Sequence, residues 1–293
     1  MKPPVFQYHD PTSVEEALEL LADHAPEAKV LAGGQSLLPL LNLRLARPSR
    51  LVDINRLDAL DYLVEDGGWL RVGARVRQRR VERDAGVRRF VPLLAEAIRY
   101  VGHPQIRNRG TVCGSLAHAD PAAELPAVAV ALGALMVARN RFGLREIPAE
   151  EFFTGPLSSA LQPDELLVEA RFPRSPTGWG WAFLEVSNRH GDYALCAVAA
   201  GVRVEADSVR EARLAYAGVG PVPVRLREAE LALVQEERLE EALRAVAEEA
   251  RRGLHPEGDI HASSAFRRHL AAVLTVRAAR LAWERARAGG HHA

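Results

Sequence analysis

The chain of 293 residues is long enough to bury a large core, as one large domain or as roughly two to three smaller ones. Its 38 basic and 38 acidic residues balance, which argues against a nucleic-acid partner. The only cysteines, Cys113 and Cys196, are too few for a disulfide framework or for a cysteine-rich zinc or iron–sulfur motif. The N-terminal residues MKPPVFQYHDP lack the apolar region of a signal peptide, and no segment approaches about 18 uncharged apolar residues. We therefore expect a cytoplasmic protein without a membrane span.

The first 55 residues predict a small β-α-β layer. An edge strand over Val5–His9 precedes a helix, whose start is indicated by the capping-box pair Ser13 and Glu16. The apolar stripe of this helix consists of Val14, Ala17, Leu18, Leu21 and Ala22. Short strands are expected over Lys29–Leu31 and Leu51–Ile54.

Between these two strands, the sequence LAGGQSLLPLLNLRL carries the adjacent glycines Gly33 and Gly34, followed by Gln35 and Ser36. Adjacent glycines most often form a tight turn. They also permit positive φ angles and the close approach of a ligand, and successive N–H groups in such a turn form an electropositive nest for a phosphate. The pattern differs from the GxGxxG of dinucleotide-binding folds, because the glycines are contiguous and Pro39 follows within a turn. An anion bound here would therefore depend on loop amides.

The middle of the chain predicts a hairpin, helices and one long polar stretch. The hairpin strands are Tyr62–Val64 and Trp69–Val76, and a helix from Pro92 to Val101 is stopped by Gly102. The stretch Gly102–Val128 is too long for a simple connector and is expected to be functional or mobile. Further expected elements are an apolar helix that runs into a strand over Glu124–Val137 and a strand over Glu165–Phe172.

The last part of the chain predicts an α+β unit after a linker at Pro173–Gly180. Three consecutive antiparallel strands are expected over Trp181–Val186, Leu195–Glu205 and Arg210–Val219. An amphipathic helix is marked by Leu239, Ala242, Leu243, Val246, Ala247 and Ala250. A last helix is expected from about Ser263 to Ala286, followed by a frayed tail at Gly289–Ala293.

The second glycine-containing loop makes a nucleotide-like cofactor the favoured interpretation of the first. Thr111, Gly114 and Ser115 offer amides and hydroxyls that could face the diphosphate from the other side. Asp120 or Glu124 could accept hydrogen bonds from ribose hydroxyls, although a turn that begins at Asp120-Pro121 is the simpler interpretation.

Other chemistries find little support in the sequence. His103, His118 and His190 lack the spacing of a metal site, and no GxSxG nucleophile elbow is present. Cys113 is either a reactive thiol or, as we favour, a filler of a small space near a ligand. Tyr193 either covers a planar ring or is an ordinary cross-strand aromatic.

With both loops described, the chain resembles the FAD-binding medium subunit of molybdenum hydroxylases, the family of carbon monoxide dehydrogenase, xanthine dehydrogenase and aldehyde oxidoreductase. LAGGQSLLPLLNLRL with LVDINRL resembles the family's first flavin motif, and IRNRGTVCGSLAHADPAAELP resembles its second. NRHGDYALCAVAAGV and RRHLAAVLTVRA are similar to its C-terminal domain.

The resemblance implies an α+β fold of the vanillyl-alcohol-oxidase type. It comprises two α+β FAD-binding subdomains, at residues 1–55 and 56–174, and a C-terminal domain with a three-stranded antiparallel sheet and helices at 175–293. The residues that the resemblance places at FAD are Ala32, Gly33, Gly34, Gln35, Ser36, Leu37, Gly102, Gln105, Thr111, Gly114, Ser115, Glu124, Leu167 and Tyr193. Two residues depart from the family pattern: Cys113 replaces a glycine, and Glu185 stands where many relatives carry a lysine.

The implied function is electron transfer through FAD, with no catalytic acid or base and no metal ligand on this chain. A large subunit would hold the molybdenum cofactor, and a small subunit would hold [2Fe–2S] clusters that reduce FAD, in a dimer of heterotrimers. Neither the reducing substrate nor the electron acceptor follows from the sequence. The alternatives are a self-contained FAD-dependent oxidase of a small organic substrate and a non-enzymatic nucleotide-binding subunit.

Overall fold

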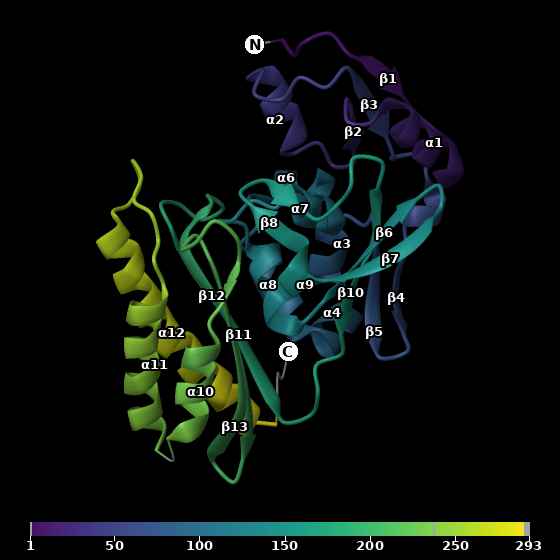
Figure 1. Ribbon diagram of the computed structural model, residues 1–293. Coiled ribbons are helices and arrows are strands. Elements are labelled where there is room, and N and C mark those ends of the chain that lie inside the picture. The colour runs from purple at the N-terminus through teal and green to yellow at the C-terminus, as the bar shows by residue number, and fades with distance from the viewer. Residues whose placement is uncertain (1, 237, 290–293) are drawn as a thin grey trace.

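The computed structural model describes residues 2–236 and 238–289. In Figure 1 the chain runs from a small N-terminal sheet, through a central sheet surrounded by helices, to a C-terminal sheet whose outer face is covered by helices. The predicted α+β class is confirmed. The domain boundaries after residues 55 and 174 stay predictions.

The N-terminal sheet has the strand order β1-β3-β2, with parallel pairing between β1 (Gln7–His9), β3 (Arg50–Asp53) and β2 (Ala28–Leu31). Its helix α1 (Val14–His24) begins after Ser13, whose hydroxyl accepts the Glu16 N–H at 3.1 Å. In an ideal capping box the Glu16 carboxylate would accept the N–H of Ser13. Here it accepts the N–H of Thr12 instead, at 2.8 Å. The predicted helix is confirmed, and the predicted edge strand is present but begins at Gln7 and not at Val5.

The central sheet has the order β4-β5-β10-β6-β7, and its neighbouring strands are antiparallel. The strands are β4 (Leu63–Asp66), β5 (Trp69–Gly73), β10 (Leu166–Pro173), β6 (Leu135–Asn140) and β7 (Gly143–Pro148). Gly67 and Gly68 join β4 to β5 with φ angles of 56° and 84°, which a two-residue hairpin turn requires. The small strands β8 (Phe153–Gly155) and β9 (Ser158–Ser159) form a separate hairpin.

Short helices fill the connections around the central sheet. They are η1 (Asp58–Leu60), α3 (Gln78–Arg83), α4 (Ala85–Phe90), α5 (Pro92–Ala97), α6 (Pro104–Arg109), α7 (Val112–His118), α8 (Glu124–Leu132) and α9 (Ala149–Phe152). The predicted helix from Pro92 to Val101 is too long, because α5 ends at Ala97 and turns lead on to Gly102. The polar stretch after Gly102 is mostly helical, since Pro104 begins α6 and the Thr111 side chain caps α7.

The C-terminal sheet has the order β11-β12-β13-β14 and is antiparallel. Its strands are β11 (Trp179–Ser187), β12 (Ala194–Glu205), β13 (Ser208–Ala217) and β14 (Val224–Arg225), so β14 must be added to the predicted three-stranded sheet. The helices α10 (Arg227–Gln235), α11 (Leu239–Gly253) and α12 (Ser264–Arg287) follow. The expected frayed tail lies outside the described residues after Gly289.

Both faces of the C-terminal sheet are buried, which explains the continuous apolar run of β12. One face joins the core around the central sheet through Trp179, Trp181 and Phe183. The other face packs its small residues, such as Ala182 and Ala200, against α10–α12. Figure 1 shows these helices on the side of the sheet that faces away from α8. This arrangement brings the start of α8 against the C-terminal strands.

Candidate functional site

The two glycine-containing loops pack directly against each other, backbone to backbone. A Cβ atom added to Gly33 would lie 2.5 Å from the carbonyl oxygen of Arg109 and 2.7 Å from the Cα of Gly110. Only glycine fits at such a contact. We call residues 32–37 the first bend and residues 109–115 the second bend. They are distant in sequence and adjacent in space.

Arg77 and Asn55 tie the two bends together. The Arg77 guanidinium donates hydrogen bonds to the carbonyl of Arg109 and to the side-chain oxygen of Asn55. The Asn55 amide in turn donates to the carbonyl of Ala32 at 2.8 Å. The sequence interpretation missed both residues. Asn55 directly follows the predicted strand Leu51–Ile54, and a polar residue at the end of a strand is the feature of the sequence that could have identified it.

The first bend presents a row of free main-chain donors. Within the described part of the chain, none of the N–H groups of residues 33–37 donates a hydrogen bond. Gly34 has a φ angle of 73°, and the Gln35 side chain donates to the Gly33 carbonyl at 3.0 Å. Unpaired, half-buried amides with this geometry form the type of nest that binds a phosphate. Burial and the charges of Arg109 and Arg75 lower the pKa of Arg77, and the charges of Asp61 and Asp53 act in the opposite direction.

The second bend uses part of its hydrogen-bonding capacity internally. The Thr111 hydroxyl accepts the N–H of Gly114 at 3.0 Å, which caps α7. Gln78 holds the bend in place, because its N–H donates to the Gly110 carbonyl at 2.9 Å. Thr111 is buried, and Ser115 is half-buried. The second bend is therefore a rigid support beside the first.

A third segment, Ser187–Ala194 at the end of β11, completes the site. The hydroxyl of Tyr193 interacts with the side chains of Ser36 and Asp120, while its side chain stays 55% exposed. Gly191 has a φ angle of 90°, and a Cβ there would lie 2.9 Å from the carbonyl of Gly102. Tyr193 therefore spans from the first bend to the start of α8.

Arg107 holds the turn at Gly102 and is almost fully buried. It donates to the carbonyls of Val101 and Gly102 at 3.0 and 2.9 Å, and it forms a bidentate ion pair with Glu82. A bidentate pair fixes geometry as well as charge. The positive φ angle of Gly102, 50°, is thus held by a side chain that the sequence interpretation did not select.

Two carboxyl groups, one buried and one half-buried, interact where β11 meets the start of α8. Glu124 is the first residue of α8 and is 4% exposed, and burial raises its pKa to about 7. On β11, burial and the charge of Glu124 raise the pKa of Glu185 to about 8. Asp120 accepts the N–H of Ala122 at 2.9 Å, so it forms the turn that the simpler interpretation predicted.

Most of the predicted cofactor-binding residues lie in the bends or in segments that contact them, whereas no side-chain hydrogen bond of the described residues ties Gln105 or Leu167 to the bends. Gln105 is exposed on α6, and Leu167 is buried in β10 beneath α7 with 4% exposure. The residues that the structure brings together are Ala32, Gly33, Gly34, Gln35, Ser36, Leu37, Gly102, Thr111, Gly114, Ser115, Glu124 and Tyr193. Their contacts with FAD stay predictions.

Cys113 fills a small space and is not an exposed nucleophile. It is 2% exposed, its sulfur lies 3.4 Å from the Val72 carbonyl oxygen, and burial raises the pKa of its thiol. Burial also raises the pKa of Cys196 to about 12. We expect neither thiol to react with a disulfide reagent in the folded protein, and both to react in denaturant. Colorimetric thiol titration checks this, and rapid modification of one native thiol would contradict it.

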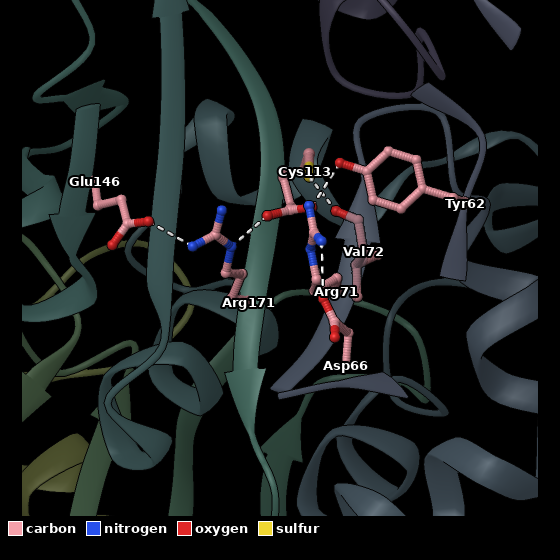
Figure 2. A network of polar contacts seen from close by, with 8 residues as sticks. Tyr62, Asp66, Arg71, Val72, Cys113, Glu146 and Arg171 are labelled. Atoms are coloured by element: carbon pink, nitrogen blue, oxygen red, sulfur yellow. Dashed lines mark hydrogen bonds and ion pairs between the residues drawn. The ribbon is translucent and has the colours of Figure 1, made fainter. Parts of the chain in front are cut away.

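A second polar cluster surrounds Glu169 on β10, beside a cavity of about 220 Å³. Figure 2 labels its members Tyr62, Arg71 and Arg171, together with Asp66 and Glu146. The Glu169 carboxylate accepts hydrogen bonds from Tyr62 at 2.6 Å and from Arg71 at 2.8 Å, and it pairs with Arg171. Burial alone would raise the pKa of Glu169, but these hydrogen bonds outweigh burial and lower it. Arg71 and Arg171 have further partners in Asp66 and Glu146. Each charged group named here has a partner among the described residues, so the cluster is a closed set of ion pairs and hydrogen bonds.

The α+β architecture and the amide-lined bends are typical of a protein that binds a nucleotide-type cofactor. Residues 4–175 match the family described as "FAD binding domain in molybdopterin dehydrogenase", and residues 181–282 match "CO dehydrogenase flavoprotein C-terminal domain". The chain therefore belongs to the family of FAD-binding subunits of molybdenum hydroxylases. Its cofactor is FAD, and it is a component of an oxidoreductase.

Similar proteins cover almost the whole chain. The chain is 42% identical to the 6-hydroxypseudooxynicotine dehydrogenase complex subunit alpha of Paenarthrobacter nicotinovorans, over 98% of this chain and 97% of the relative. A structure of quinoline 2-oxidoreductase from Pseudomonas putida 86 matches with a TM-score of 0.93 and 39% identity, over 98% and 99% of the two chains.

A structure of carbon monoxide dehydrogenase from Hydrogenophaga pseudoflava, in the form that lacks the Mo-pyranopterin moiety, matches with a TM-score of 0.94. The identity is 37%, over 97% of this chain and 99% of that chain. Between residues 2–236 and 238–289, no helix is both long enough and apolar enough to cross a membrane.

Proposed function

We propose that the chain holds FAD between its two bends and passes electrons from an iron–sulfur partner chain to an external acceptor. The observation that carries this proposal is the row of unpaired amides at residues 33–37, packed against the second bend. FAD fits this arrangement, because its diphosphate needs main-chain donors and close access, and the glycines provide both.

When bound, FAD supplies the electron-transfer chemistry, and the protein binds and orients it. The N–H groups of residues 33–37 would bind the diphosphate, with Thr111 and Ser115 as further donors. Glu124 would accept a ribose hydroxyl, and Tyr193 would cover the bound cofactor beside the first bend. Outer-sphere electron transfer needs no acid or base, and none of these residues is assigned such a role.

The number of cysteines supports the placement of the iron–sulfur clusters on a different chain. Cys113 and Cys196 are both buried and cannot supply the four thiolates of a [2Fe–2S] cluster. Electrons would therefore reach FAD from a small iron–sulfur subunit, and a large molybdenum subunit would oxidise the substrate. We propose a dimer of such heterotrimers, in which this chain has an N-terminal FAD-binding part (1–55 and 56–174) and a C-terminal domain (175–293).

The named relatives act on different compounds, among them carbon monoxide and quinoline, although their chains resemble this one closely. This variety supports the selection of substrate by a partner chain.

Co-expression with neighbouring genes, affinity purification through this chain, and metal and flavin analysis test the proposal. We expect the complex to contain molybdenum, iron and about one FAD per copy of this chain. In stopped-flow experiments in which the reducing substrate is added to the protein, FAD should be reduced only when the iron–sulfur partner is present. Substrate turnover by the isolated chain with FAD would contradict the proposal and establish a self-contained oxidase.

A further inference from the structure

The side-chain amide of Asn55 can join the first bend to Arg77 in one orientation only. Its Nδ2 atom donates to the Ala32 carbonyl at 2.8 Å, and its Oδ1 atom accepts from the Arg77 guanidinium. A carbonyl oxygen only accepts hydrogen bonds, and a guanidinium only donates them. If the amide were turned by half a rotation, donor would face donor and acceptor would face acceptor, and both contacts would be lost.

Asp53 holds this amide from the end of β3. Its Oδ1 atom accepts the Nδ2 group of Asn55 at 2.5 Å and the main-chain N–H of Asn55 at 2.8 Å. An ionised carboxylate has no donor, so it can face only the NH₂ edge of the amide. The bond to the main-chain N–H forms an Asx turn, which sets the direction of the chain as it leaves β3. Asp53 therefore fixes both the backbone and the side chain of Asn55.

Strand pairing places Asp53 next to the first bend. In the parallel pair of β2 and β3, Asp53 lies opposite Leu31, which directly precedes Ala32. The Oδ2 atom of Asp53 accepts the hydroxyl of Tyr8 at 2.7 Å, and Tyr8 is 55% exposed on the edge strand β1. The two carboxylate oxygens thus have separate partners, one in the chain that reaches the bend and one in the edge strand.

We propose that Asp53 is a positioning residue of the FAD site that acts through Asn55 and not through the sheet. Because it keeps the Asn55 amide directed at Ala32, it holds the first bend in place, and the N–H groups of residues 33–37 stay directed at one diphosphate. The inference rests on the proposed function. What the site requires at this position is a hydrogen-bond acceptor, and the negative charge is not needed.

Titration of the apo-protein with FAD tests the inference in three variants of the full chain. Asp53→Leu keeps a side chain of similar size but removes the acceptor, and we expect about tenfold weaker binding of FAD. Asp53→Asn keeps an acceptor for Asn55 and should bind FAD within about twofold of the wild type. Tyr8→Phe removes the other partner of Asp53 and should bind FAD like the wild type.

A double-mutant cycle separates a role through Asn55 from a role in the stability of the sheet. In the Asn55→Ala background, Asp53→Leu should weaken FAD binding by less than about threefold, because the side chain that Asp53 orients is absent. A loss of about tenfold that persists in this background would overturn the inference. So would an Asp53→Leu variant with the affinity of the wild type, or an Asp53→Asn variant as weak as Asp53→Leu.

Should Asp53→Leu fail to fold, Asp53→Val replaces it in the same cycle, because valine has no acceptor and suits a strand. The same outcomes then support or overturn the inference. Wild-type protein that binds no FAD would contradict the proposed function together with this inference, whereas the outcomes above bear on Asp53 alone.

Discussion

Gly33→Ala is expected to weaken FAD binding on the order of 100-fold, which corresponds to about 2.7 kcal/mol. The added methyl group would lie 2.5 Å from the Arg109 carbonyl oxygen and 2.7 Å from the Cα of Gly110. Both neighbours are main-chain atoms that cannot rotate away, so the two bends must move apart. The separation disturbs the row of amides at residues 33–37, whose donors must converge on one diphosphate.

Titration of the apo-protein with FAD, followed by flavin fluorescence, measures this loss of affinity. Gly143→Ala is the matched control, because a Cβ at Gly143 meets no atom within 4 Å and the residue lies at the start of β7. The control should bind FAD like the wild type. An unchanged dissociation constant for Gly33→Ala would mean that the binding of FAD does not depend on the contact between the two bends.

Arg77→Met is expected to weaken FAD binding by about 10- to 100-fold and to lower stability by about 1–3 kcal/mol. Methionine retains an apolar stem but cannot donate to the Arg109 carbonyl or to Asn55. Asn55, which donates to Ala32 in the first bend, then loses one of its two side-chain partners and keeps only Asp53 beside it. The bends remain folded, yet their relative position is no longer fixed.

The measurements are FAD titration and thermal unfolding of the apo-protein. Arg80→Met, from the same region, is the control: Arg80 is exposed and pairs with Asp61 at 3.1 Å on the surface. A surface pair of this kind contributes only about 0–1 kcal/mol. Equal losses of FAD affinity in Arg77→Met and Arg80→Met would show that Arg77 has no special part in joining the bends.

The elements that depend on local chemistry could be predicted from the sequence. Ser13 marks the start of α1, the Gly67-Gly68 pair marks the β4–β5 hairpin, and the continuous apolar run after Leu195 marks β12. In each case the information lies within a few residues. The helices α6 and α7 were hidden, because glycine and polar residues there suggested a loop while Pro104 and the Thr111 cap acted as helix starts.

The site was predictable only in part. The glycines of the two bends are evident from their motifs. The hydrogen bonds that join the two bends, however, come from residues that are distant in sequence. Arg77 resembles any exposed arginine until it meets Arg109 and Asn55. Likewise, burial and the charge of Glu124 raise the pKa of Glu185, and both effects depend on how β11 packs against α8.

The central claim is that the first and second bends together hold the diphosphate of FAD. A crystal structure of the chain with FAD bound tests it most directly. We expect diphosphate oxygens at about 2.7–3.2 Å from main-chain nitrogens of residues 33–37, with Thr111 or Ser115 on the same ligand. Diphosphate density away from residues 33–37, on another surface of the protein, would contradict the claim.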